Sequence, residues 1–291
     1  ASEDRSVLVD KFLEAAVEID VDAISDGGDV VIGGIMQHIE NAGVHSGDSA
    51  CILPAYSLSE SVLSRIRNHT LDLALNLNVI GLMNVQYAVK DDEIYVLEVN
   101  PRASRTVPFV SKSIGVPLAK LAARVMTGRS LRDLGFTEEV KLNYYCVKEA
   151  VMPFIKFPGV DSILGPEMKS TGEVMGIDAD YGAAFAKSQM SVNAGLPTSG
   201  RIFISVNPMD REAILPIASA LRQAGFTLVA TTGTRGFLEE NGIPAELIYK
   251  IHEGRPNVID LLTDGHVGLM INTPIGRESH EDDYELRRAA I

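Results

Sequence analysis

Residues 94–105 read IYVLEVNPRASR, and the rest of the chain is organised around this stretch. An apolar strand ends here in a carboxylate, an amide and two arginines. Because side chains alternate along a strand, Glu98 and Asn100 point to the same face. Pro101 then stops the ladder, since proline lacks an N–H and keeps the preceding residue out of the helical region. The stretch therefore predicts a strand that presents polar side chains at its end.

The residues before this strand predict its partner in a hairpin. Residues 85–89 (VQYAV) have the composition of a strand, and residues 90–93 (KDDE) are the expected turn. If the turn centres on Asp92, Gln86 lies directly opposite Glu98. The hairpin then carries its oxygen-bearing side chains on one face.

That face is expected to hold Gln86, Glu98 and Asn100, with Arg102 and Arg105 just beyond the open end of the hairpin. Oxygen ligands suit Mg²⁺, which often shares them with substrate phosphates. Arginine offers a forked, permanent cation to an anion. A metal and an anion at one strand end fit phosphoryl transfer. Spacing alone leaves open the alternative that the hairpin is a solvent-facing edge with solvated arginines.

Length and composition exclude several classes of protein. The 291 residues, 46% of them hydrophobic, are enough for two domains or one large one. A formal net charge of −13 without a Lys/Arg cluster argues against a nucleic-acid partner. No apolar run reaches membrane-spanning length, which argues against a membrane protein. Cys51 and Cys146 lie far apart without CxxC spacing, which predicts buried thiols in a reducing cytoplasm.

The first two-thirds of the chain predicts mostly antiparallel structure. Alternation over residues 17–24 predicts a half-buried strand. Residues 40–49 are polar and glycine-rich and predict a loop, a common place for binding groups. Ser59 or Ser61 is expected to cap a helix whose inward stripe, at a spacing close to 3.6 residues, is Leu63, Ile66, Thr70, Leu73 and Leu77. The other expected elements are a returning strand at 30–36, a helix at 116–126, a strand at 142–152 and a helix at 181–189.

The pattern changes after residues 193–200 (NAGLPTSG), which have the composition of a linker. Strands then alternate with helices, which predicts βα units in a parallel sheet and ligands at the carboxyl ends of the strands. The strands are expected at 202–206, 227–231, 247–250 and 267–272, and the helices near 211–223, 235–240 and 257–263. The strand ends carry Ser205, Thr231, Thr234, Lys250, Asn272 and Thr273. Hydroxyls, backbone N–H groups and an ammonium suit a phosphate; alternatively, the threonines only cap a helix.

Several common catalytic motifs are absent from the sequence. It contains no GxxxxGK[ST], GxGxxG, GxSxG or HExxH, so these nucleotide, hydrolase and zinc-protease sites are not supported. The six histidines are scattered singly. Of these, His45 is the candidate for a binding role, because it lies inside the glycine-rich loop.

Two runs, GLMNVQYAV at 81–89 and LEVNPRASRTVPFVSK at 97–112, resemble the ATP-grasp signature of carbamoyl-phosphate synthetase large subunits. The segments at 40–49, 156–161 and 165–173 are similar to the same family. The part after the linker resembles the methylglyoxal-synthase-like regulatory domain of those subunits. The resemblance implies a partial ATP-grasp domain, a largely antiparallel sheet with helices, at residues 1–194. It implies a parallel α/β domain, truncated at its C-terminus, at residues 195–291.

The resemblance also implies a reaction and its site. It implies the second synthetase half, which transfers the ATP γ-phosphoryl group to carbamate and forms carbamoyl phosphate for pyrimidine and arginine synthesis. ATP would bind with a pair of Mg²⁺ or Mn²⁺ ions, and K⁺ is a further implied cation. The implied roles are metal binding for Gln86, Glu98 and Asn100, nucleotide contacts for Glu18, Val44, His45, Ser46, Gln86 and Glu98, and contacts to carbamate or the transferred phosphate for Arg102 and Arg105. This chemistry needs positioning and charge neutralisation but no protein nucleophile.

Partners and effectors follow from the same resemblance. It implies a glutamine amidotransferase small subunit, an oligomeric parent, and ornithine bound by Glu40, Asp48 and Glu149. UMP or IMP would bind the strand-end residues of the second domain, although Pro274 replaces a threonine that the family often has. The glycine-rich lid over the phosphates is expected to precede residue 1, so the chain alone is expected to show negligible synthesis.

Three rival interpretations are open at this point. One is another ATP-grasp ligase or carboxylase, although residues 103–109 (ASRTVPF) favour the synthetase. A second is a purely allosteric or binding module without catalysis. A third is a methylglyoxal synthase, which resemblance disfavours because residues 253–256 read EGRP where that enzyme carries a catalytic aspartate after two glycines.

Overall fold

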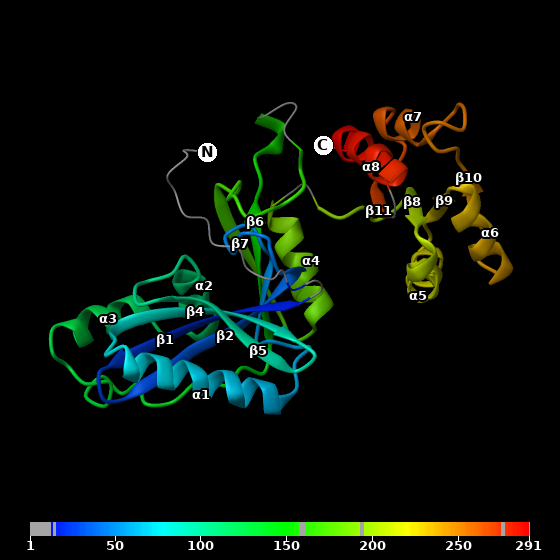
Figure 1. Ribbon diagram of the computed structural model, residues 1–291. Coiled ribbons are helices and arrows are strands. Elements are labelled where there is room, and N and C mark those ends of the chain that lie inside the picture. The colour runs from blue at the N-terminus through cyan, green and yellow to red at the C-terminus, as the bar shows by residue number, and fades with distance from the viewer. Residues whose placement is uncertain (1–12, 14–15, 157–160, 193–194, 275–276, 291) are drawn as a thin grey trace, which may run out of the picture. The chain divides into compact units, whose positions relative to one another are not determined.

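The computed structural model describes residues 13, 16–156, 161–192, 195–274 and 277–290 (Figure 1). The chain divides into two compact units, one formed by residues 1–152 and 164–193 and the other by residues 153–163 and 194–291. The sequence-based boundary at 194/195 stays a prediction. Within the described residues, no helix has both the length and the apolar character needed to cross a membrane.

The described part of the first unit is built on a seven-stranded antiparallel sheet with the order β5-β4-β1-β2-β3-β6-β7. Its strands are β1 (Val17–Asp26), β2 (Val30–Asn41), β3 (Cys51–Leu53), β4 (Ile80–Lys90), β5 (Glu93–Asn100), β6 (Tyr145–Val151) and β7 (Gly172–Asp178). Its helices are α1 (Glu60–Asn76), α2 (Val107–Ile114), α3 (Leu118–Met126) and α4 (Tyr181–Val192). The predicted antiparallel character is confirmed.

Helices cover both faces of this sheet (Figure 1). The face under α1 packs a core that includes Val62 and Ile66 of the helix with Val21 and Val85 of the strands. The opposite face packs against α2 and α3. The cap of α1 is Ser59, whose side chain accepts a hydrogen bond from the N–H of Val62. The two faces thus carry separate apolar cores, and a smaller apolar cluster that includes Ile52, Val147 and Ala184 lies under α4.

The predicted apolar stripe of α1 is wrong in part. Its buried side chains are Val62, Ile66, Thr70 and Ala74, whereas Leu77 is 52% exposed just after the helix. The apolar residues are spread around the helix, so periodicity alone does not select the stripe that meets the sheet.

The prediction that β1 is half-buried is also wrong. The side chains of Glu18, Asp20 and Asp22 are 4%, 2% and 1% exposed. The strand lies between β2 and β4 inside the sheet, with α1 over one face. On the other face, which carries the acids, Asp22 bonds Ser104 and Thr106 of the loop that follows β5, and Glu18 and Asp20 lie beside His38 of β2. The alternation therefore separates an apolar face from a buried polar face.

Helix α4 lies directly on β6 and β7 (Figure 1). A Cβ atom added at Gly176 would come within 2.1 Å of the Ala184 carbonyl oxygen and 2.6 Å of the Ser188 nitrogen. Only glycine allows the backbones to approach so closely. This close contact packs α4 against β6 and β7 at one edge of the sheet.

The described part of the second unit contains a four-stranded parallel sheet with the order β10-β9-β8-β11. Its strands are β8 (Arg201–Val206), β9 (Thr227–Ala230), β10 (Glu246–Leu247) and β11 (Leu269–Thr273). Its helices are α5 (Arg211–Gln223), α6 (Thr232–Glu240), α7 (Val258–Thr263) and α8 (Arg277–Ala290), with short 3₁₀ turns at Phe154–Lys156 and Pro208–Asp210. The predicted parallel α/β architecture is confirmed.

Two cores lie on opposite faces of this sheet. Ile204 and Leu228 pack with Ile214 of α5 and Leu238 of α6, whereas Phe203 and Val229 pack with Val258 of α7 and Leu286 of α8. The strand predicted at 247–250 is shorter than expected. Lys250 donates its backbone N–H to the Glu253 side chain at 3.0 Å, so the chain turns there instead of continuing the ladder.

Candidate functional site

The hairpin of β4 and β5 confirms the predicted pairing of Gln86 with Glu98. The turn differs from the expected one, and a shift in register compensates for the difference. Lys90 pairs with Glu93 across a two-residue turn in which Asp91 and Asp92 have φ values of 52° and 62°. That turn alone would place Leu97 opposite Gln86. Opposite Gln86 and Tyr87 the register shifts by one residue, because β5 carries a β-bulge in which Leu97 is the extra residue. The bulge is therefore what brings Glu98 opposite Gln86.

Register extends this pair into a polar grid across three adjacent strands. Asp20 of β1 pairs with Gln86 of β4, which pairs with Glu98 of β5. The next row along the same face is Asp22, Asn84 and Asn100. Sequence reasoning missed Asp20, Asp22 and Asn84 as site residues. The alternation over residues 17–24 places the acids on one face, but it carries no information on which strand lies beside them.

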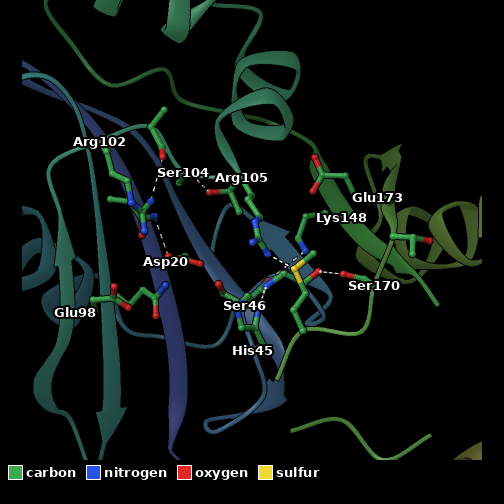
Figure 2. Close-up of a pocket in the computed structure, with 18 residues that line it drawn as sticks. Asp20, His45, Ser46, Glu98, Arg102, Ser104, Arg105, Lys148, Ser170 and Glu173 are labelled. Atoms are coloured by element: carbon green, nitrogen blue, oxygen red, sulfur yellow. Dashed lines mark hydrogen bonds between the residues drawn. The ribbon is translucent and has the colours of Figure 1, made fainter. Parts of the chain in front are cut away.

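A cavity of about 700 Å³ opens over this grid. Of the predicted catalytic and nucleotide-binding residues, it is lined by Gln86, Glu98, Arg102, Arg105, His45 and Ser46. Figure 2 shows Glu98 and Arg102 along one side of the pocket, with Arg105, Lys148 and His45 along the other. Asn100, Glu18 and Val44 are not among the lining residues. The structure thus gathers most of the predicted set around one cavity.

Several lining residues were not predicted from the sequence. They are Asp20, Gly47, Asn84, Ala103, Ser104, Thr106, Lys148, Met168, Ser170, Thr171, Gly172 and Glu173. Lys148 is 1% exposed, and its Nζ donates to the carbonyl oxygens of Ser49 at 2.8 Å and Ser46 at 3.5 Å. A buried ammonium is compensated here by carbonyl oxygens of the glycine-rich loop. The lysine therefore shapes the wall that carries His45 and Ser46.

The floor of the site is a hydrogen-bonded chain of buried polar groups. Asn84 Nδ2 donates to Asp20 Oδ1 at 2.9 Å and to Asp22 Oδ1 at 3.0 Å. Asp20 Oδ2 lies 3.2 Å from His38 Nε2, and His38 Nδ1 lies 3.7 Å from Glu18. Burial and the neighbouring Asp20 carboxylate raise the pKa of Asp22 to about 6, against hydrogen bonds that lower it. Glu18 thus faces His38 inside the sheet, and burial raises its pKa.

The predicted acidic cluster is brought together only in part. Burial and repulsion from Glu40 raise the pKa of Glu149 to about 7, while Gln189 Nε2 donates to Glu149 at 2.6 Å. Asp48 is 1% exposed, and its two carboxylate oxygens accept the backbone N–H groups of residues 169 and 170 at 2.7 and 2.9 Å. Asp48 therefore holds the glycine-rich loop against the neighbouring segment, whereas Glu40 and Glu149 form a half-buried like-charge pair.

The pocket suits a hard cation that shares its ligands with a bound phosphate. Within the described residues, no group of three or more His, Cys, Asp or Glu side chains is placed to hold a metal ion. Of the predicted ligands, Glu98 is the one carboxylate, and it lies beside the amide of Gln86. Mg²⁺ with several ligands taken from water or phosphate fits such a sparse donor set.

A second cavity of about 250 Å³ lies at the strand ends of the parallel sheet. All six predicted residues line it: Ser205, Thr231, Thr234, Lys250, Asn272 and Thr273. Thr234 Oγ1 accepts the Val206 N–H at 3.1 Å, and Thr273 Oγ1 accepts the Asn207 N–H at 3.1 Å. These two hydroxyls thus also hold the loop that follows β8.

Sequence reasoning missed Arg211, which adds a second cation to this strand-end pocket. Its Nε is buried without a hydrogen-bond partner among the described atoms, and its guanidinium carbon lies 5.7 Å from the centre of the Phe237 ring. Arg211 was treated only as the start of a helix. The available signal is its place at the start of the helix that follows β8, only a few residues after Ser205, because such a helix begins at the carboxyl end of the strand.

Family models match parts of both units, and together they describe a protein with an ATP-binding domain followed by an MGS-like domain. Residues 1–134 match the family model described as the carbamoyl-phosphate synthase L chain, ATP binding domain, and residues 213–291 match the MGS-like domain model. The chain is 57% identical over 291 residues to the carbamoyl phosphate synthase large chain of Archaeoglobus fulgidus. The large chains of Pasteurella multocida and Pseudomonas putida are 56% and 57% identical over 291 and 290 residues.

These matches show that the chain belongs to the carbamoyl-phosphate synthase large-chain family. Each match covers 100% of the chain, which spans 27% of the length of each of these three relatives. The family is that of the sequence resemblance, and its members are ATP-dependent ligases. The 56–57% identity to these large chains favours the synthetase over the first rival interpretation.

Proposed function

We propose that the first unit forms part of the site at which a carbamoyl-phosphate synthase transfers the ATP γ-phosphoryl group to carbamate. The observation that carries the proposal is the pairing of Gln86 with Glu98 on the floor of a cavity whose rim holds Arg102 and Arg105. This arrangement places oxygen donors and fixed cations around one space. Phosphoryl transfer depends on such positioning and charge neutralisation.

In the proposed mechanism the side chains bind and orient, and no protein atom forms a covalent intermediate. Glu98 and Gln86 would hold Mg²⁺ or Mn²⁺, with Asn100 next to them on the strand, and the metal would neutralise phosphate charge. Arg102 and Arg105, both exposed toward solvent, would hold the carbamate or the phosphoryl group in line. His45 and Ser46 would contact the nucleotide, and K⁺ would be a further cation of the intact enzyme.

The test is Glu98→Gln in the full-length large chain. We expect loss of carbamoyl-phosphate formation by about a thousandfold or more, because removing the carboxylate removes the anionic metal ligand. The fold is expected to persist, since the Glu98 side chain is exposed. The matched control is Glu93→Gln on the same strand, where the side chain is 71% exposed outside the cavity. Full activity of Glu98→Gln would refute the proposal.

We also propose that the strand-end pocket of the second unit binds the phosphate of a regulatory nucleotide such as UMP or IMP. Lys250 and Arg211 provide cations beside the hydroxyls of Ser205, Thr231 and Thr234. A nucleotide that binds only the folded state raises its melting temperature. Titration with UMP and IMP, followed by thermal unfolding, tests the proposal; an unchanged melting temperature at saturating nucleotide would contradict it.

Ornithine is the proposed ligand of the acidic cluster. Glu40 and Glu149 lie close enough to repel each other, so a cationic diamino acid would relieve that repulsion. Asp48 would contribute indirectly, through the loop that it holds. We further propose that the parent is oligomeric, pairs with a glutamine amidotransferase small subunit, and works in the cytoplasm in pyrimidine and arginine synthesis. Cys51 and Cys146 are both buried free thiols, which fits a reducing compartment.

A further inference from the structure

The Asp22 carboxylate lies beneath the loop that carries the two arginines. Its Oδ1 accepts a hydrogen bond from Ser104 Oγ at 2.7 Å, and its Oδ2 accepts one from Thr106 Oγ1 at 2.7 Å. The two hydroxyls also lie 2.8 Å from each other. Asp22 is 1% exposed and Thr106 is 5% exposed. One buried carboxylate thus bonds the residues on both sides of Arg105.

This anchorage matters because the loop has little regular structure of its own. Residues 101–106 connect β5 to α2 without helix or strand. Within them, the Arg102 N–H donates to the Asn100 carbonyl at 2.8 Å, which turns the chain after Pro101. The Arg105 guanidinium contacts the Met168 sulfur at the pocket rim. Through the side chains of Ser104 and Thr106, Asp22 ties the chain on both sides of Arg105 to the sheet.

Asp22 is itself held on the grid. Asn84 donates one N–H to Asp22 and the other to Asp20, and Asn84 lies opposite Asn100 of β5. A carboxylate accepts on both oxygens at once, whereas an amide presents one acceptor and one donor group. Charge-assisted bonds of this kind are stronger than bonds between neutral groups. The carboxylate is thus suited to hold two hydroxyls and an amide together.

We propose that Asp22 is a positioning residue for the transfer reaction, which fixes Arg105 over the pocket through Ser104 and Thr106. The inference rests on the proposed function, since that function gives Arg105 its contact with the carbamate or the transferred phosphate. Asp22 itself does not touch the reacting groups. Its contribution is to hold the chain on both sides of the exposed Arg105, so that the guanidinium is positioned at the pocket before the reaction begins.

The main test is Thr106→Val in the full-length large chain, since valine keeps the shape of threonine and removes the bond to Asp22. The readout is the reverse transfer, in which carbamoyl phosphate donates its phosphoryl group to MgADP and yields ATP and carbamate. We expect kcat/KM for carbamoyl phosphate to fall about tenfold, as expected for one charge-assisted hydrogen bond. The KM for MgADP is expected to stay unchanged. Thr106→Ser restores the hydroxyl and is expected to restore the rate.

A double-mutant cycle assigns the effect to Arg105. If Thr106 acts through Arg105, Thr106→Val has no further effect in an Arg105→Ala background. Asp22→Asn is expected to lower the same kcat/KM at least as much as Thr106→Val. Ser104→Ala, which removes the second hydroxyl, gives an independent variant if Asp22→Asn does not fold.

The outcomes separate the two proposals. If Arg105→Ala leaves the reverse transfer unchanged, the proposed role of Arg105 is wrong and the positioning role falls with it. If Arg105→Ala lowers the rate, but Thr106→Val and Ser104→Ala leave it unchanged or act additively with Arg105→Ala, then only the positioning role of Asp22 is wrong. An equal rise in the KM for MgADP would also overturn it, because that result indicates general disruption of the pocket.

Discussion

The two candidate pockets are built in different ways. The pocket of the first unit lies on the face of an antiparallel sheet, and its floor combines side chains from β1, β4 and β5. The pocket of the second unit lies at the carboxyl ends of parallel strands. The first depends on register between strands, whereas the second requires only that the strands run in the same direction. A site on a sheet face is therefore harder to recognise from sequence than a site at strand ends.

The pockets also differ in how they carry charge. The floor of the first holds the carboxylates of Asp20 and Asp22, both almost fully buried and bridged by Asn84. The second surrounds its cavity with hydroxyls and amides, and its Lys250 is exposed. Removing the partner of a buried charge lowers the free energy of unfolding strongly, whereas removing an exposed charge changes it little. Substitutions in the first pocket should therefore affect folding, and substitutions in the second mainly ligand binding.

The largest expected effect on stability comes from Asn84→Leu. Leucine keeps the volume but leaves two buried carboxylates without their shared donor, which is expected to cost about 3 kcal/mol of the free energy of unfolding. The measurement is urea unfolding followed by circular dichroism. The control is Gln86→Leu, on the same strand and face but only half-buried, with an expected change below about 1 kcal/mol. Equal effects of the two substitutions would show that the bridge to Asp20 and Asp22 is unimportant.

Lys250→Ala is expected to weaken nucleotide binding by about 1.5–3 kcal/mol, because one ammonium–phosphate contact is lost. The free energy of unfolding is expected to change by less than about 0.5 kcal/mol, since the side chain is exposed. Calorimetric titration with UMP and with IMP measures the first quantity and urea unfolding the second. Arg255→Ala removes a cation that is 81% exposed and outside the pocket. If both variants bind equally well, Lys250 does not contact the ligand.

The half-buried pair of Glu40 and Glu149 predicts that stability depends on pH. The pKa of Glu149 rises from 4.5 to about 7, so between these values the folded chain keeps a proton that the unfolded chain releases. Stability therefore falls as the pH rises through this window and stays lower above it, by on the order of 2 kcal/mol. Urea unfolding at pH 5 and pH 8 should show this difference for the native chain and a smaller one for Glu149→Gln. Identical pH dependence in the two proteins would contradict the assignment.

The smallest expected effect is that of Ser205→Ala. Loss of one neutral hydroxyl should weaken nucleotide binding by about 1 kcal/mol and leave folding unchanged. Ser205 Oγ lies 3.4 Å from Thr231 Oγ1, so the substitution removes only one long contact between the two hydroxyls. Titration of Ser205→Ala beside Ser219→Ala, on α5 outside the pocket, measures the difference. A loss as large as that of Lys250→Ala would mean that neutral hydroxyls dominate this pocket.

The same contrast explains which expectations were met. The six strand-end residues line one pocket as predicted, because a βα pattern defines the strand direction and direction determines which ends meet. In the first unit, the pairing of Gln86 with Glu98 was predicted correctly although the turn and the bulge were not. Asp20, Asp22 and Asn84 were missed, since nothing within their own segments indicates that β1 and β4 are neighbours.

The sequence by itself determined the type of most elements, the polar end of the strand at residues 94–101, and the family of the chain, whereas α2, β3 and β7 were not predicted from it. Alternation, capping and proline effects act over a few residues, so they can be read locally. Only the tertiary structure decided that Leu97 is the extra residue of a bulge, that β1 is buried on both faces, and that Asp22 bonds the loop beside Arg105. These features depend on contacts between segments as many as 84 residues apart, which only packing of the whole unit brings together.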